Sequence, residues 1–194
     1  KILPVLLLVF LGFSDGRLNA QNCRAGNTTF KSGEELDYIV AYDWFVIWTD
    51  VGNVKLTISD TTFGNEPAYK FKALGTTFKN WDWIFKVRDR FETVVDDKTL
   101  KPYSAIREIR EGNYRQYDKY IYNFNHNVAY ARNKTNEKPI TLDTIPITGC
   151  TFDIMSALLY ARNVDFTKYN IGDSIPISIL LDKESYPIYF RYLG

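Results

Sequence analysis

Apolar and polar residues alternate along much of this chain of 194 residues, with the period of two that is typical of strands buried on one face. The first alternating run extends from Leu36 to Trp44, and similar runs surround Ile58 and Phe71. Turn residues, such as those at 64–67, separate the runs. The pattern therefore predicts a meander of antiparallel strands with one solvated and one buried face.

Further strands are predicted at residues 103–110, 114–124, 175–181 and 186–193, and residues 133–144 are polar enough to predict a loop with a short strand. Residues 81–95 fit both periods: Trp81, Trp83 and Phe85 alternate, but a helical stripe is also present. The aromatic and β-branched content of this segment favours a strand.

One segment late in the chain has the pattern of a helix, at residues 152–163. Thr151 is its predicted cap, and Phe152, Met155 and Leu159 belong to its apolar stripe. Eight to ten strands with one late helix predict a mainly β protein. We expect a curved antiparallel sheet, an open or half-closed barrel, with the helix packed on its concave side. The last hairpin has no partner strand in the pattern, so we expect the natural chain to continue beyond Gly194.

The first twenty residues differ from the rest, because a basic Lys1 precedes an almost unbroken apolar run that ends at Phe13. Small and polar residues follow, up to Ala20. This is the pattern of a signal peptide cleaved near Ala20, and a buried N-terminal helix is the alternative. A single β domain at residues 21–194 would then be exported to the periplasm or cell envelope of a bacterium. The apolar run is too short to span a membrane, and we expect no span in the mature chain.

Compartment and charge narrow the chemistry further. Residues 1–20 contain two of the 24 basic and one of the 23 acidic residues, so the predicted mature domain is neutral and we expect no nucleic-acid partner. Cys23 and Cys150 are the two cysteines, and export to an oxidising compartment predicts a disulfide between them. Two free buried thiols are the alternative.

No catalytic or cofactor motif is present in the sequence. His126 is the single histidine and sits in a polar turn, where it is more typical of a solvated side chain than of a catalytic triad. Three dispersed Cys and His residues do not make a zinc site, and no phosphate-binding or dinucleotide-binding loop occurs. We therefore expect no catalytic residue, metal or cofactor, and a protein that is not an enzyme.

Aromatic residues make up 16% of the chain, and concave aromatic sheets bind lipids by area burial or sugars by stacking. Asp89 would share a strand face with Phe85, and an apolar face requires a partner for a carboxylate, such as Arg107 or Arg110. Asp89 is either a polar anchor in a ligand cavity or part of a structural ion pair. The aromatic residues are either ligand contacts or part of the ordinary core. The candidate ligand-binding residues are Trp44, Trp48, Trp81, Trp83, Phe85, Asp89, Tyr120 and Tyr122.

Several segments, taken in order, resemble one family. They are the segments at residues 30–38, 42–52, 87–91, 99–102 and 150–163. Together they resemble domain-of-unknown-function family 3108, a family of exported bacterial envelope proteins, over most of residues 22–193. The resemblance implies a half-barrel sheet distantly similar to the periplasmic lipoprotein carriers, with further strands at the C-terminus, and it implies no established activity.

Three functions follow from these observations. We favour a binding or carrier protein for an apolar or amphipathic ligand, such as a lipid. The first alternative is an interaction or scaffold module that adds a strand from an envelope protein to its sheet edge. The second is a glycan hydrolase, which would need two carboxylates that converge in a cleft.

Overall fold

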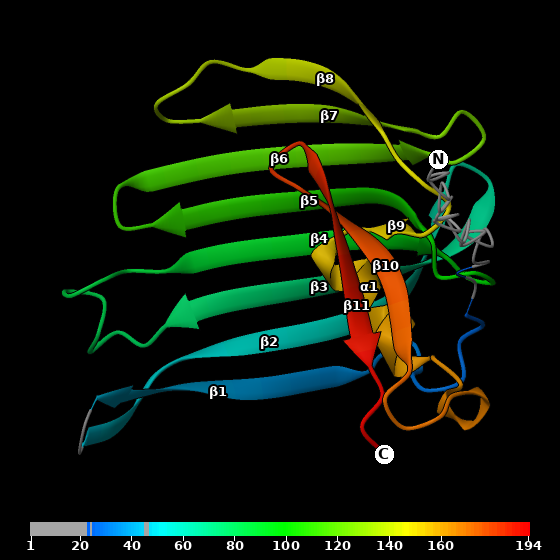
Figure 1. Ribbon diagram of the computed structural model, residues 1–194. Coiled ribbons are helices and arrows are strands. Elements are labelled where there is room, and N and C mark those ends of the chain that lie inside the picture. Colours follow the sequence, from blue (N-terminus) through cyan, green and yellow to red (C-terminus); the bar gives the residue numbers. More distant parts are fainter. Residues whose placement is uncertain (1–22, 24, 45–46) are drawn as a thin grey trace, which may run out of the picture.

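The computed structural model describes residues 23, 25–44 and 47–194 (Figure 1). The predicted signal peptide at residues 1–20 lies outside this part of the chain. The described residues are mainly β, as predicted, with a large open sheet, a small second sheet and one α-helix.

The large sheet has eight antiparallel strands, each paired with its neighbour in the sequence. The strands are β1 (Glu35–Trp44), β2 (Ile47–Phe63), β3 (Glu66–Thr77), β4 (Arg88–Asp96), β5 (Pro102–Glu111), β6 (Tyr114–Asn123), β7 (Val128–Thr135) and β8 (Thr141–Pro146). The two edge strands, β1 and β8, do not pair with each other, so the barrel stays open.

The small sheet covers one side of the large one. It consists of β9 (Thr151–Phe152), β10 (Ser174–Leu181) and β11 (Glu184–Arg191), with β9 parallel to β10. The helix α1 (Ile154–Arg162) contacts β3 and β4 of the large sheet and β9 and β10 of the small sheet, and the short 3-10 helix η1 (Phe166–Lys168) follows it. In Figure 1, β10 and β11 cross the strands of the large sheet with α1 beneath them. The helix thus packs on the concave side, as predicted.

The main core lies between these layers. Phe71 of β3, Leu159 of α1 and Ile175 of β10 are almost completely buried in one cluster. A second cluster joins Tyr120 and its neighbours on β6 to β8 to Leu180 of β10. Complete burial of one such aliphatic side chain stabilises the fold by about 1.5–3 kcal/mol, so the clusters hold the small sheet firmly on the large one.

The N-terminus of α1 differs from the prediction that Thr151 caps it. Thr151 belongs to β9, and the cap is Asp153, whose carboxylate accepts hydrogen bonds from the amides of Met155 and Ser156. The hydroxyl groups of Thr93 and Ser156 also donate to Asp153, at 2.9 and 2.6 Å. Asp153 caps the helix here because four donors converge on its side chain and offset the cost of its burial.

The segment before β4 corrects the predicted strand at residues 81–95, because residues 79–84 form turns and the strand begins only at Arg88. The amide of Phe85 donates to the carbonyl of Trp81, and the Thr77 hydroxyl donates to Asp82 at 2.7 Å. These local bonds satisfy the backbone without a partner strand. The aromatic alternation was therefore misleading as far as Phe85.

The predicted disulfide is present between Cys23 and Cys150, with a sequence separation of 127 residues. It joins the segment before β1 to the residue before β9. The amide of Thr28 also donates to the Asn163 side chain at 2.7 Å. Both links fasten the N-terminal segment to the two ends of the α1 region.

Candidate functional site

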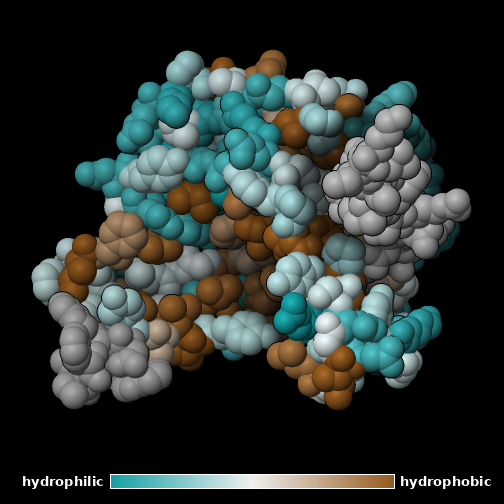
Figure 2. Space-filling view, viewed as in Figure 1, coloured by the Kyte–Doolittle hydropathy of each residue, from teal (hydrophilic) through white to brown (hydrophobic). Residues whose placement is uncertain are grey.

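The candidate site lies on the face of the large sheet against which α1 packs, here called the concave face. Neither α1 nor the small sheet covers this face completely: in Figure 1 they lie over the right-hand part of the sheet and leave the other ends of the strands uncovered. Figure 2 shows this side hollowed in the middle, with apolar side chains gathered there.

Edge strand β1 contributes three apolar or aromatic residues to this face. Leu36 is opposite Leu56 of β2, which packs against the main core, so the alternation places Tyr38, Val40 and Tyr42 on the same concave face. These three side chains are 52%, 42% and 60% exposed. They lie on the core-facing side of the strand, but no described element covers them.

Helix α1 contributes a second exposed apolar surface to this face. Ile154, Leu158 and Arg162 follow one another at intervals of four residues and form one stripe of the helix. Arg162, at the C-terminal end of α1, pairs with Glu34, directly before β1, at 2.7 Å, so this end of the stripe approaches the start of β1. Ile154 and Leu158 are exposed on the stripe. We call Tyr38, Val40, Tyr42, Ile154 and Leu158 the concave patch.

Polar side chains occupy another part of the concave face, under the turn between β10 and β11. Arg107 donates from Nε and Nη2 to buried Asp118, at 2.8 and 2.6 Å, and also pairs with Asp182 of the turn. Lys183 of the same turn pairs with Asp143 of β8 at 2.9 Å. This network attaches the hairpin to the sheet.

The structure places the predicted residues Tyr120 and Tyr122 together, in the second core cluster. The Tyr120 hydroxyl accepts hydrogen bonds from Asn133 and from the amide of Lys183, and so supports the hairpin attachment. The Tyr122 hydroxyl is buried and has no hydrogen-bond partner among the described residues. Burial raises the pKa of both phenols.

Asp89 lies on the concave face of β4, opposite Gly75, but neither arginine considered for it pairs with its carboxylate. Arg107 pairs with Asp118, and Arg110 pairs with Glu108. Asp89 instead accepts a hydrogen bond from the backbone amide of Arg110 at 2.9 Å. Its other neighbour is Glu111, whose carboxyl pKa is raised by burial and then by the charge and hydrogen bonding of Asp89. The two acidic side chains are therefore direct neighbours on this face.

Trp81 and Trp83 lie in the turns before β4 and not in a strand of the sheet. Trp81 donates its indole N–H to the Asp50 carbonyl at 2.9 Å, and Trp83 is 82% exposed in the turn before β4. Phe85 lies against the β5–β6 turn, close to Gly112. Trp44 is the last residue of β1 and Trp48 is near the start of β2, and their side chains are outside the described part of the structure.

Sequence reasoning therefore missed the concave patch as a set. The signal was the mixed character of β1, where Tyr38, Ile39 and Val40 are consecutive apolar or aromatic residues instead of a clean alternation. An edge strand with apolar residues on both faces has more to cover than one core provides.

Two further observations concern the described residues only. Among them, no group of three or more His, Cys, Asp or Glu side chains is arranged to hold a metal ion. None of their helices is both long and apolar enough to cross a membrane.

Comparison with known proteins gives one match. A family model described as "Protein of unknown function (DUF3108)" matches residues 37–194, which confirms the resemblance to that family. The match includes both sheets and α1, and Cys23 lies before it. No curated protein and no solved structure matches the chain.

Proposed function

Because this chain belongs to the DUF3108 family, to which no function is assigned, we propose a function from the geometry of the concave face. The proposed function is that of a non-enzymatic, exported binding or carrier protein. Its ligand is apolar or amphipathic, such as a lipid. The observation that carries the proposal is the concave patch, whose five apolar or aromatic side chains are exposed on β1 and α1. Figure 2 shows apolar surface gathered in a hollow on this side of the molecule. Contiguous exposed apolar surface of this kind marks binding sites.

The shape of the site suits an elongated apolar group. Its exposed apolar residues are spread along an extended strand and along one stripe of a helix instead of converging on a point. An acyl chain binds by burying apolar area along its length, at about 25 cal/mol per Å². The tyrosine hydroxyls of β1 could bind the polar end of the ligand.

Two observations support the non-enzymatic and exported parts of the proposal. Besides burial, Asp89 is the neighbour that raises the pKa of Glu111, so these two carboxyls are in direct contact, whereas a glycosidase needs two carboxyls about 5 Å or more apart. A disulfide is typical of proteins that mature in an oxidising compartment.

Strand addition at β1 is the second candidate function. Ile39 and Val40 point to opposite faces of this edge strand and both are exposed, which suits pairing with a partner strand. The two candidate functions predict different molecules that co-purify with the protein. A carrier retains a small molecule, and a strand acceptor retains a polypeptide.

Native mass spectrometry of the mature protein purified from its own envelope tests the proposal. We expect an added mass of lipid size that organic extraction removes. A well-folded protein with no adduct, and no binding of a fluorescent fatty acid after extraction, would contradict it.

Matched variants locate the site. Val40→Glu and Leu158→Glu should each weaken fatty-acid binding by about tenfold, since each puts a charge against the apolar contact. Leu142→Glu is the control, because Leu142 is exposed on β8 on the opposite face of the sheet. Equal loss of fatty-acid binding in all three variants would contradict the proposal that the ligand binds at the concave patch.

A further inference from the structure

The face of the large sheet that points away from α1, here called the convex face, concentrates positive charge. Arg107 lies on the concave face, so the neighbouring residues Glu108 and Arg110 point the other way. Their register partners extend this face across β4 to β7. The cations on it are Arg88, Arg90, Arg110, Arg115, Lys119, Arg132 and Lys134.

Two of the cross-strand pairs on this face join like charges. Arg110 is directly opposite Arg115, and Lys119 is directly opposite Arg132. Like charges in this position destabilise a sheet by about 0.2–1 kcal/mol per pair. A chain whose formal net charge is only +1 therefore collects repelling cations on one surface, which indicates that an anion belongs there.

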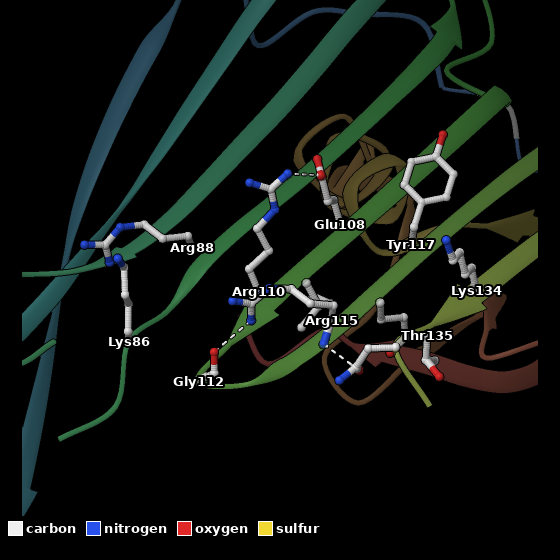
Figure 3. A pocket seen from close by; sticks show the side chains of 12 residues that line it. Lys86, Arg88, Glu108, Arg110, Gly112, Arg115, Tyr117, Lys134 and Thr135 are labelled. Atoms are coloured by element: carbon white, nitrogen blue, oxygen red, sulfur yellow. Dashed lines mark hydrogen bonds and ion pairs between the residues drawn. The ribbon is translucent and has the colours of Figure 1, made fainter. Parts of the chain in front are cut away.

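A cavity of about 590 Å³ lies among these cations, beside the β5–β6 turn (Figure 3). Its basic lining residues are Lys86, Arg88, Arg110, Arg115 and Lys134, and the Tyr117 ring stands next to Lys134. The volume is in the range of small-molecule sites, about 300–1,000 Å³.

Carboxylates of the protein neutralise only part of this lining. Arg88 pairs with Asp82 at 2.6 Å, and Arg110 pairs with Glu108. Lys86, Arg115 and Lys134 form no ion pair with any residue that the structure describes. The guanidinium of Arg115 is nevertheless held in place, because its Nη1 donates to the carbonyls of Gly112 and Tyr114 at 2.8 and 2.7 Å.

We propose that this convex-face cavity binds a phosphate-bearing anion. Three cations without a carboxylate partner call for more than one negative charge, which a phosphomonoester carries. Arginine matches phosphate oxygens with its planar fork, and lysine adds a mobile point charge. The phosphate belongs either to a free phosphorylated metabolite or to the headgroup of an anionic lipid. The site is on the opposite side of the sheet from the concave patch and does not depend on it.

Calorimetric titration at low ionic strength tests the proposal, with inorganic phosphate and glycerol 3-phosphate as soluble probes. Phosphatidic acid, whose headgroup is a phosphomonoester, in phosphatidylcholine vesicles is the lipid probe, and its binding is followed by co-sedimentation. The double variant Arg110→Gln/Arg115→Gln should weaken binding at least tenfold. The matched control is Lys70→Gln/Lys72→Gln, which removes the same charge from the same face outside the cavity.

The outcomes separate clearly. Loss of soluble-probe binding in the cavity variant alone supports a free phosphorylated ligand, and selective loss of vesicle binding alone supports a lipid headgroup. Absence of binding to any probe overturns the proposal. Equal losses in both double variants also overturn it, because they show only the general field of a basic surface. A thermal unfolding scan with phosphate and with chloride at equal ionic strength provides a second readout: phosphate should raise the Tm of the wild type more than chloride does, and should not do so in the cavity variant.

Discussion

Asp118 shows how a single buried charge is accommodated in this fold. Its side chain is 1% exposed, and it accepts hydrogen bonds from Arg107, from Gln116 at 2.8 Å and from Asn133 at 2.7 Å. A carboxylate removed from water needs such complete pairing, because an isolated one would be too costly to bury.

Asp118→Ala should therefore lower the free energy of unfolding by about 3–5 kcal/mol, since it leaves the largely buried Arg107 half-paired and removes one acceptor from each of Gln116 and Asn133. Urea unfolding measures the loss. Asp182→Ala removes the other, largely exposed partner of Arg107 and should cost less than about 1 kcal/mol. Comparable losses in the two variants would contradict this view.

The buried cap of α1 gives a prediction about pH. Burial raises the pKa of Asp153, although the hydrogen bonds from Ser156 and Thr93 act in the opposite direction. Because the folded-state pKa is above the unfolded value of about 3.8, the stabilising contribution is present below that value and is lost as pH rises through the folded-state pKa. An asparagine at this position does not ionise, so Asp153→Asn should not lose stability in this way. The unfolding free energy of the variant relative to that of the wild type should therefore increase from pH 3 to pH 7. No change in the difference would contradict it.

Asp153→Ala separates the cap from the charge. It removes the acceptor as well, and should destabilise the protein by about 1–2 kcal/mol at every pH. Asp165→Ala, at the exposed cap of η1, is the control and should have a smaller effect.

At this scale the sequence predicted positions better than partners. Asp89 does share a face of β4 with Phe91, but Trp83 and Phe85 lie before the strand, and the arginines proposed for Asp89 pair with Asp118 and Glu108. Partner choice depends on the register of β4 to β6, and alternation within one strand does not contain that register.

Among the elements, the β10–β11 hairpin depends most on charged contacts for its position. Its turn is held on the large sheet by Lys183–Asp143 and Arg107–Asp182. The hydrogen bond from Lys183 lowers the pKa of Asp143, so this link stabilises the hairpin above the unfolded pKa and is lost as pH falls through the folded-state value.

We therefore expect the amide NMR shifts of Asp182 and Lys183 to move together as the pH is lowered below about 4. Asp143→Asn should show the low-pH shifts already at neutral pH. Unchanged shifts in that variant would contradict a role for the Lys183–Asp143 link and leave the hairpin held by Arg107–Asp182 and by apolar contacts such as those of Leu180.

Alternation predicted most elements because each long strand has a core-facing row, such as Tyr69, Phe71 and Ala73 on β3. It failed at residues 79–84, where side-chain hydrogen bonds to Asp82 stabilise turns despite the aromatic period. It also missed β9, since two residues paired in parallel with a distant strand leave no periodic signal.

At the scale of the whole molecule, the disulfide joins segments that the sheet alone does not connect. Closing a loop of more than 100 residues stabilises a protein by about 4–5 kcal/mol through the entropy of the unfolded chain. Cys23→Ser/Cys150→Ser should lose about this amount, measured by urea unfolding with and without reductant. The wild type should approach the variant only when reduced. A wild type that is equally stable in both conditions would contradict the prediction.

The distribution of surface properties also emerges only at this scale. A balanced total charge concealed a basic convex face, and a uniform aromatic content concealed an uncovered patch on β1. The convex face is basic on the side of the sheet that α1 does not cover, and the patch on β1 is exposed where α1 and the small sheet do not reach. The sequence pattern indicates that a helix packs on the sheet, but it does not indicate where on the sheet the helix lies.

The strictly sequential strand order has a consequence for how the protein forms. Every pairing in the large sheet is between consecutive strands, so it can grow one hairpin at a time as the chain emerges, with little loop closure at any step. Cys23, by contrast, precedes all eight strands, and its partner follows them. It must remain a thiol until the sheet is complete, and during that interval its available disulfide partners are other molecules. Covalent dimers linked through Cys23 are therefore the misfolded species to look for when synthesis outpaces folding.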